Sequence, residues 1–156
     1  MLRKLLPTAF AVATCGLTAA NADAMSISLG KPTLIGRVAI SEPVTVSCSP
    51  LDPSLTVFGE SVNVSVEQAS GRSIARGSGS AFGSTLLFPC DNSDNTIAVN
   101  VAADTNGPPF KGGRAVFTAS AGATAGTPIP GCNGCFAGPF VSENASVGPA
   151  ALNLKG

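Results

Sequence analysis

Apolar and polar residues alternate along most of this 156-residue chain, and this spacing limits its possible folds more than any other feature. Val62, Val64 and Val66 alternate with polar residues, and the same alternation recurs over 97–101 and 115–121. Successive side chains of a strand point to opposite faces, so the pattern predicts strands with one buried face. No window of residues 25–156 shows a continuous apolar stripe with the three-to-four-residue repeat that an amphipathic helix requires. We therefore expect an all-β protein.

Turn-forming residues separate the predicted strands. Clusters of Pro, Asp, Asn and Gly occur over 50–54, 91–95 and 104–113. Short strands at intervals of about ten residues are typical of a β-sandwich or barrel. We predict an antiparallel, immunoglobulin-like Greek-key sandwich of about seven to eight strands. Residues 122–148 are rich in Gly, Ala, Ser and Pro, and we predict that they form a flexible loop before a last strand.

The N-terminal residues have the order of a secretory signal peptide. Residues 1–4 carry the two positive charges of Arg3 and Lys4. Residues 5–19 are mainly apolar and uncharged, and residues 20–24 offer small residues for cleavage. The apolar run is shorter than the about 20 residues that a transmembrane helix needs. We predict a signal peptide over 1–24 and a single secreted β-sandwich domain over 25–156, with no membrane span after cleavage.

Cys15 opens an alternative in which the N-terminus is lipidated. The string Val12-Ala13-Thr14-Cys15 resembles a lipobox, but Thr14 stands where Gly or Ala is expected. Cleavage without lipidation is therefore the preferred prediction.

Four cysteines follow the predicted signal: Cys48, Cys90, Cys132 and Cys135. An even number in an exported protein indicates a disulfide framework, although four cysteines allow three pairings. We favour Cys48–Cys90, because each residue ends a predicted core strand. That bridge closes a loop of about 40 residues, worth roughly 4 kcal/mol in the chain-entropy account. We also favour Cys132–Cys135, whose Asn-Gly centre can turn tightly.

The spacing of Cys132 and Cys135 also matches a redox-active dithiol. Such a site needs a helix after it, because the helix N-terminus lowers the thiol pKa. The flanking segments 128–131 and 136–139 are rich in Pro and Gly and do not predict a helix. A zinc site of four thiolates normally needs two close pairs, and this chain has one. Disulfides are therefore preferred over both alternatives.

The chain contains no His, Trp or Tyr. Ser-His-Asp and Cys-His catalysis are thereby excluded, and we expect neither an enzyme nor a cofactor. Two carboxylate pairs remain as acid–base candidates: Glu42 with Asp52, and Glu60 with Glu67. Nothing in their spacing singles out either pair, so we expect these side chains on solvent faces. Charged residues make up only 12% of the chain and form no basic stripe, which argues against nucleic-acid binding.

Asp91, Asp94 and Asn95 are the candidate ligands for a metal ion. Carboxylate and amide oxygens suit calcium, but the spacing does not match an EF-hand loop. Asx-rich strings also form tight turns without any ion. We favour the turn and keep calcium as the alternative.

The most distinctive predicted surface loop contains Pro108, Pro109, Phe110 and Lys111. The two prolines stiffen it, and an aromatic residue presented on a rigid loop is a recognition device. In the alternative, Phe110 closes the end of the sandwich and the loop only connects two strands. The second arrangement is the preferred one.

Three strings carry a resemblance to a known group of proteins: residues 43–50, residues 87–90 and residues 107–116. They resemble small secreted bacterial immunoglobulin-like β-sandwich proteins, which are domains of unknown function. In size and disulfide plan the chain is also similar to neocarzinostatin-type apoproteins. The missing catalytic residues and the disulfide-held scaffold predict a secreted, non-enzymatic module that contacts an unknown extracellular protein or surface component. The alternative is a small-ligand carrier with a cleft between the sheets, near 115–121.

Overall fold

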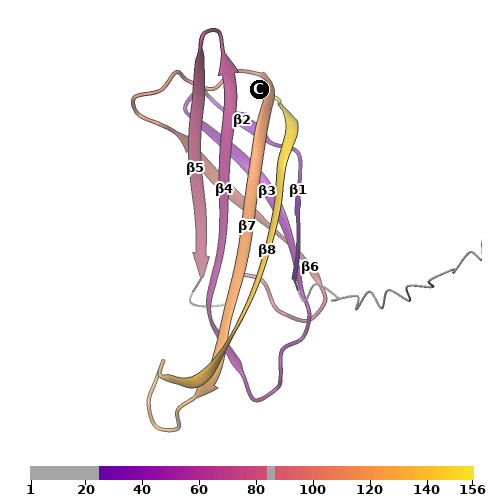
Figure 1. Cartoon of the computed structure of the whole chain (residues 1–156), viewed down its shortest axis with the longest axis vertical. Coiled ribbons are helices and arrows are strands. Elements are labelled where there is room, and N and C mark those ends of the chain that lie inside the picture. Colours follow the sequence, from indigo (N-terminus) through magenta and orange to yellow (C-terminus); the bar gives the residue numbers. More distant parts are fainter. Residues whose placement is uncertain (1–24, 84–86) are drawn as a thin grey trace, which may run out of the picture.

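The computed structural model describes residues 25–83 and 87–156 (Figure 1). The described residues form strands, turns and irregular segments, with no helix among them, so the all-β prediction is confirmed. The strands are β1 (Met25–Leu29), β2 (Thr33–Ile35), β3 (Ala39–Cys48), β4 (Thr56–Ser70), β5 (Ser73–Gly83), β6 (Asp94–Ala103), β7 (Gly113–Pro128) and β8 (Phe136–Leu154). The predicted signal peptide lies outside the described residues, and no helix within them is long and apolar enough to cross a membrane.

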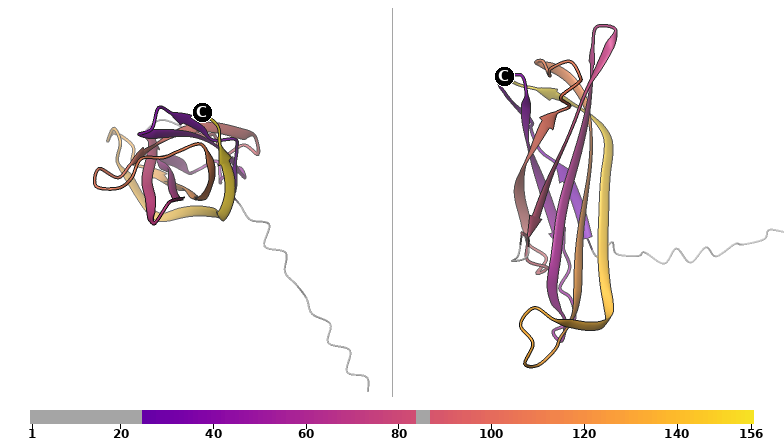
Figure 2. Two further views of the ribbon diagram at one scale, coloured as in Figure 1. Left: turned by 90° about the horizontal axis from the view of Figure 1, so that it is seen from above. Right: turned by 90° about the vertical axis from the view of Figure 1, so that its left-hand side faces the viewer.

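The eight strands form one antiparallel sheet in the order β1-β3-β6-β5-β4-β7-β8, with β2 paired to β3. The sheet curls until its ends approach each other, as the end-on view in Figure 2 shows. A parallel bridge joins Thr33 to Lys155, and the Leu34 amide donates a hydrogen bond of 2.7 Å to the Lys155 carbonyl. The fold is therefore a barrel-like sandwich.

The described sheet has its shortest pairing at the junction of β5 and β6, where only two residue pairs are in register. Glycines on β5 allow this close approach. A Cβ atom on Gly77 would lie 2.3 Å from the Ala102 carbonyl oxygen, and one on Gly79 would lie 2.2 Å from that of Asn100. Any side chain at either position would push the two strands apart.

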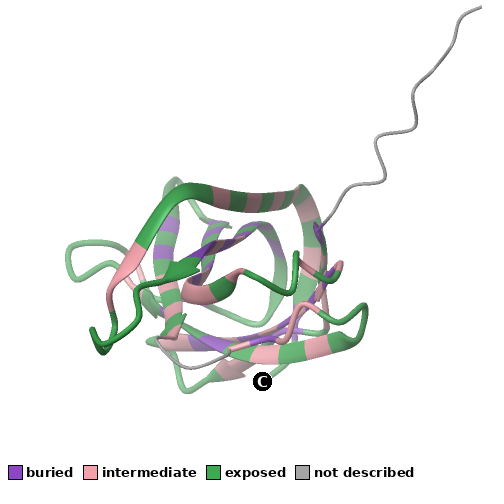
Figure 3. Ribbon diagram, turned by 90° about the horizontal axis from the view of Figure 1, so that it is seen from below, coloured by how far each residue is buried: buried purple, intermediate pink, exposed green. Residues whose placement is uncertain are grey.

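The interior is built by alternate residues of each long strand. Figure 3 shows this alternation as bands of buried and exposed residues along the ribbons. Phe88, Phe110 and Phe117 are the largest fully buried side chains. Each contributes roughly 1.5–3 kcal/mol through burial of apolar surface. β7 fills its inner face mainly with alanines, which leave space for these rings.

The prediction of a flexible loop over 122–148 is wrong. β7 continues to Pro128 and β8 begins at Phe136, and the two strands pair along most of their length. β7 is also paired to β4, so its backbone hydrogen bonds are made on both sides. Small residues at alternate inner positions keep the strand period, although the Gly- and Ala-rich composition suggests a loop.

The β7–β8 hairpin extends to the end of the molecule drawn lowest in Figure 1. There Phe58 stacks on Phe136 with ring centroids 4.4 Å apart, and Phe140 meets Phe58 edge-on at 5.7 Å. The hairpin tip beyond these rings carries the Cys132–Cys135 disulfide. Aromatic packing thus holds the strand ends that support the tip.

Candidate functional site

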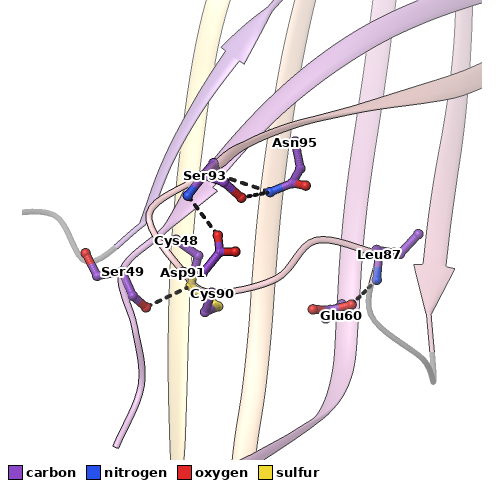
Figure 4. The surroundings of a disulfide bond; sticks show 8 residues. All are labelled: Cys48, Ser49, Glu60, Leu87, Cys90, Asp91, Ser93 and Asn95. Carbon is purple, nitrogen blue, oxygen red and sulfur yellow. Dashed lines mark hydrogen bonds between the residues drawn. A yellow bond between two sulfur atoms is a disulfide. The ribbon is translucent and has the colours of Figure 1, made fainter.

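Both favoured disulfide pairings are present. Cys48 at the end of β3 is bonded to Cys90, 42 residues later (Figure 4). Cys132 is bonded to Cys135 in the turn between β7 and β8. The segment after Cys135 is a strand, so the helix that a redox-active dithiol requires is replaced by β8. The cysteines therefore act as structural crosslinks.

The predicted recognition loop does not present its aromatic residue. Phe110 is completely buried, and Gly77 lies against it, since a Cβ there would approach Phe110 Cζ to 2.8 Å. The buried Gln68 side chain fixes the next residue: it accepts a hydrogen bond from the Lys111 amide and donates one to the Lys111 carbonyl, both at 2.8 Å. The hypothesis that Phe110 is exposed for recognition is wrong, and the preferred prediction that Phe110 is buried at the end of the fold is confirmed. Pro108 lines a surface hollow between its own loop and the start of β5, whereas Pro109 is exposed.

The candidate calcium ligands form a tight turn. Asp91 Oδ1 accepts a 2.8 Å hydrogen bond from the Ser93 amide, and Asn95 Nδ2 donates to the Ser93 carbonyl (Figure 4). Hydrogen bonds from Ser93 lower the pKa of the Asp91 carboxyl. Asp94 begins β6 and pairs with Ser47. Among the described residues no three acidic, Cys or His side chains are grouped to hold a metal ion. The Asx turn is therefore the arrangement observed.

Two of the carboxylates expected on solvent faces are buried. Glu42 on β3 is fully buried, and Glu60 on β4 is 5% exposed. The strand positions of these residues could have predicted their burial. Glu42 is two residues from the buried Ile40 and Val44, and Glu60 is two residues from the buried Val62, so each points to the same face as its buried neighbours. Strand alternation therefore places both carboxylates inside.

Each buried carboxylate binds one backbone amide and keeps one oxygen without a partner among the described residues. Glu42 Oε1 accepts a 3.0 Å hydrogen bond from the Gly30 amide, and Glu60 Oε2 accepts one from the Leu87 amide (Figure 4). Burial raises the pKa of Glu42 to about 7, and burial also raises the pKa of Glu60. Neither candidate acid–base pair is brought together, because Glu42 and Glu60 are buried whereas Asp52 and Glu67 are exposed. Glu67 forms an ion pair with Arg76.

The outer surface of β5, β4, β7 and β8 carries rows of short polar side chains that run across the strands. We call this surface the polar face. Its first row is Ser78, Ser65 and Thr118; its second is Ser80, Asn63, Ser120 and Ser146; its third is Phe82, Ser61, Gly122 and Asn144. These residues come from segments far apart in the sequence, and strand register alone aligns them.

The third row lies in a depression of the polar face. Two adjoining hollows of about 280 and 340 Å³ share Ser61, Gly122 and Asn144, and Phe82 lines the second. We call them together the transverse groove. Gly122 makes room for it: a Cβ there would lie 2.7 Å from Asn144 Oδ1. Phe82 is 73% exposed at the β5 end, the most exposed large apolar residue described.

The polar side chains of the face keep their hydrogen-bonding capacity free. Within the three rows, no side chain forms a hydrogen bond to another described residue; the nearest such contact is Thr124 to Ser142, 3.5 Å apart, beside the third row. Glu60 contributes to the groove but its carboxyl is directed inward to the Leu87 amide. Hydroxyl and amide groups can both donate and accept, so the groove is a neutral surface whose polar groups can exchange water for a ligand beside an exposed aromatic ring.

Comparison with known proteins finds no matching family model, curated protein or solved structure. Function is therefore argued from the geometry of the polar face and the transverse groove.

Proposed function

We propose that this protein is a secreted, non-enzymatic binding module that contacts a cell-surface or extracellular component through its polar face. The observation that carries the proposal is the transverse groove, where the exposed Phe82 ring adjoins polar side chains that form no hydrogen bond to another residue of the described ranges 25–83 and 87–156. Interfaces are typically anchored by aromatic residues and completed by polar groups. The face combines both features.

The scaffold under the polar face supports this role. β4 is hydrogen-bonded to β5 on one side and to β7 on the other, and β7 continues the sheet to β8. A surface held in this way loses little conformational freedom on binding, which preserves affinity. The two disulfides are compatible with an extracytoplasmic location, where such bonds persist.

The immunoglobulin-like Greek-key plan belongs to the same proposal. The neighbours β4, β5 and β6 are consecutive in the chain, and β3 returns to lie beside β6, which supports a Greek-key order. A secreted bacterial family of this kind is consistent with that order and with the Cys48–Cys90 bridge. Solving the structure of a relative with the same strand order would test it.

The small-ligand carrier remains the second candidate because of the seam between β1 and β8. A hollow of about 360 Å³ there is lined by Met25, Ile27 and Ala145 together with polar residues. The inward side chains around Phe117 and Ala121 are almost completely buried, so they offer no exposed surface to a ligand near 115–121. The polar face therefore has the better support.

Cell-surface binding tests the proposal directly. The purified, oxidised protein is labelled and its binding to the cells that produce it is measured, alongside Ser120→Lys and Ser28→Lys. Ser120 is central to the polar face, whereas Ser28 is an exposed residue of β1. We expect Ser120→Lys to abolish binding and Ser28→Lys to retain it. Absence of binding by the unmodified protein, or equal loss in both variants, would contradict the proposal.

A further inference from the structure

The transverse groove crosses four strands, from Phe82 on β5 through Ser61 and Gly122 to Asn144 on β8. Adjacent strands lie about 4.8 Å apart, so the row spans about 14 Å across the sheet. Ser80, Asn63, Ser120 and Ser146 form the next row on one side of it. An elongated ligand lying across the strands would thus meet polar groups at every strand.

The lining of the groove defines the charge of its ligand. Its polar and aromatic side chains are hydroxyls, the two amides of Asn63 and Asn144, and one phenyl ring. Glu60 is the one acidic residue among the lining residues described, and it directs its carboxyl inward. The ion pair of Glu67 and Arg76 lies beyond the first row, near a separate hollow. An anionic or cationic ligand would meet no opposite charge in the groove, so a neutral ligand fits best.

The arrangement of apolar and polar groups defines the ligand further. A sugar ring has a face of C–H groups and a rim of hydroxyls. The exposed Phe82 ring offers an apolar surface for such a face, and the unpartnered side chains of Ser61 and Asn144 offer donors and acceptors for the rim. Leaving polar groups unpaired in a contact is costly, which favours a ligand rich in hydroxyls.

We propose that the transverse groove binds a neutral polysaccharide, with one sugar ring stacked on Phe82 and the following sugars hydrogen-bonded along the row to Asn144. This inference rests on the proposed function of the polar face and names its ligand class. A second copy of this chain is the competing occupant, which the sedimentation measurement distinguishes.

Binding to purified polysaccharides tests the inference. The oxidised full protein is mixed with insoluble cellulose, chitin, xylan and starch, and with polygalacturonate as the anionic comparison, and depletion from solution is measured. We expect saturable binding to at least one neutral polysaccharide and none to polygalacturonate. Sedimentation of the protein alone at several concentrations measures self-association.

Three variants locate the binding. Phe82→Ala removes the stacking ring and is expected to weaken binding about tenfold. Gly122→Val fills the groove floor next to Asn144 Oδ1 and is expected to abolish it. Phe140→Ala is the matched control, because this ring is also exposed but packs edge-on against Phe58 and does not line the groove. Thermal melting shows whether each variant is folded. If Gly122→Val does not fold, the comparison of Phe82→Ala with Phe140→Ala still tests the inference.

The outcomes separate the inference from the proposed function. Preference for polygalacturonate, or equal weakening by Phe82→Ala and Phe140→Ala, overturns the inference. Absence of binding to every neutral polysaccharide, with cell binding still lost in Ser120→Lys, overturns the ligand class and leaves the binding module standing. Concentration-dependent dimers that Phe82→Ala dissociates would assign the face to a second copy. If the unmodified protein binds neither cells nor any neutral polysaccharide, both the inference and the proposed function are overturned.

Discussion

On the inner face of the sheet, Glu42, Glu60 and Gln68 lie among valines and alanines, whereas on the outer face Phe82 lies among serines and asparagines. The three inner exceptions share one behaviour. Each hydrogen-bonds the backbone of a segment outside its own strand, at Gly30, Leu87 or Lys111 respectively. Phe82 has no such structural task in the described protein and is mostly exposed. Polar residues inside therefore hold chain connections in place, while the apolar residue outside is available for binding.

The largest effect should come from comparing two phenylalanines on opposite sides of this division. Phe110→Ala removes a fully buried ring and is expected to lower the free energy of unfolding by about 3–5 kcal/mol. Phe82→Ala removes an exposed ring and should change it by no more than about 0.5 kcal/mol. Denaturant unfolding of both variants measures the difference. Similar losses would break the inside–outside comparison.

The inner carboxylate Glu42 should make stability depend on pH. Its pKa is about 7 in the folded protein and near the ordinary 4.5 when unfolded. Below pH 4.5 it is protonated in both states, and as pH rises toward 7 only the unfolded state releases the proton. The free energy of unfolding should therefore fall over this window, by at most about 3 kcal/mol.

Glu42→Gln is the matched variant for this pH dependence, because an amide oxygen can still accept from Gly30. We expect it to flatten the fall in stability and to exceed the unmodified protein in stability above pH 7. Denaturant unfolding at a series of pH values measures both effects. A variant with an unchanged slope would show that Glu42 does not control it. Glu60, whose pKa shifts in the same direction, would then be substituted in turn.

Gln68 should have a smaller effect, confined to one end of the molecule. Gln68→Ala leaves the Lys111 amide and carbonyl without their side-chain partner and is expected to cost about 1–3 kcal/mol. Hydrogen exchange at the Lys111 amide should accelerate more than exchange in β3. Uniform acceleration across the sheet would mean that Gln68 acts through the whole core and not through this loop.

The smallest effect is expected on the outer surface just beyond the first row of the polar face. Arg76→Ala removes an ion pair whose two side chains are more than half exposed. Exposed pairs of this kind contribute little because water and salt screen them. We expect no measurable change in melting temperature at moderate salt. A clear decrease would show that the outer face also stabilises the fold.

Part of the candidate site can be predicted from single strands. Alternation around Val62 and Val64 places Ser61 and Asn63 on the outer face, and the same parity rule places Glu42 and Glu60 inside. The hairpin strands over 122–148 are harder to predict. Gly and Ala have low strand preference, and the inward and outward residues of this segment are mostly small, so the apolar–polar alternation is weak. Pairing of β7 with both β4 and β8 supplies the hydrogen bonds that composition does not indicate.

The sequence by itself determined the all-β class, the faces of the clearest strands and the two disulfide pairings, since each depends on local spacing or on few alternatives. Tertiary structure decided the curling of the sheet, the pairing of residues 122–148 as strands and the alignment of Phe82 with Asn144, 62 positions later. The reason is that register between distant strands is set by the whole set of inner contacts, and a shift of one residue would turn every side chain to the other face.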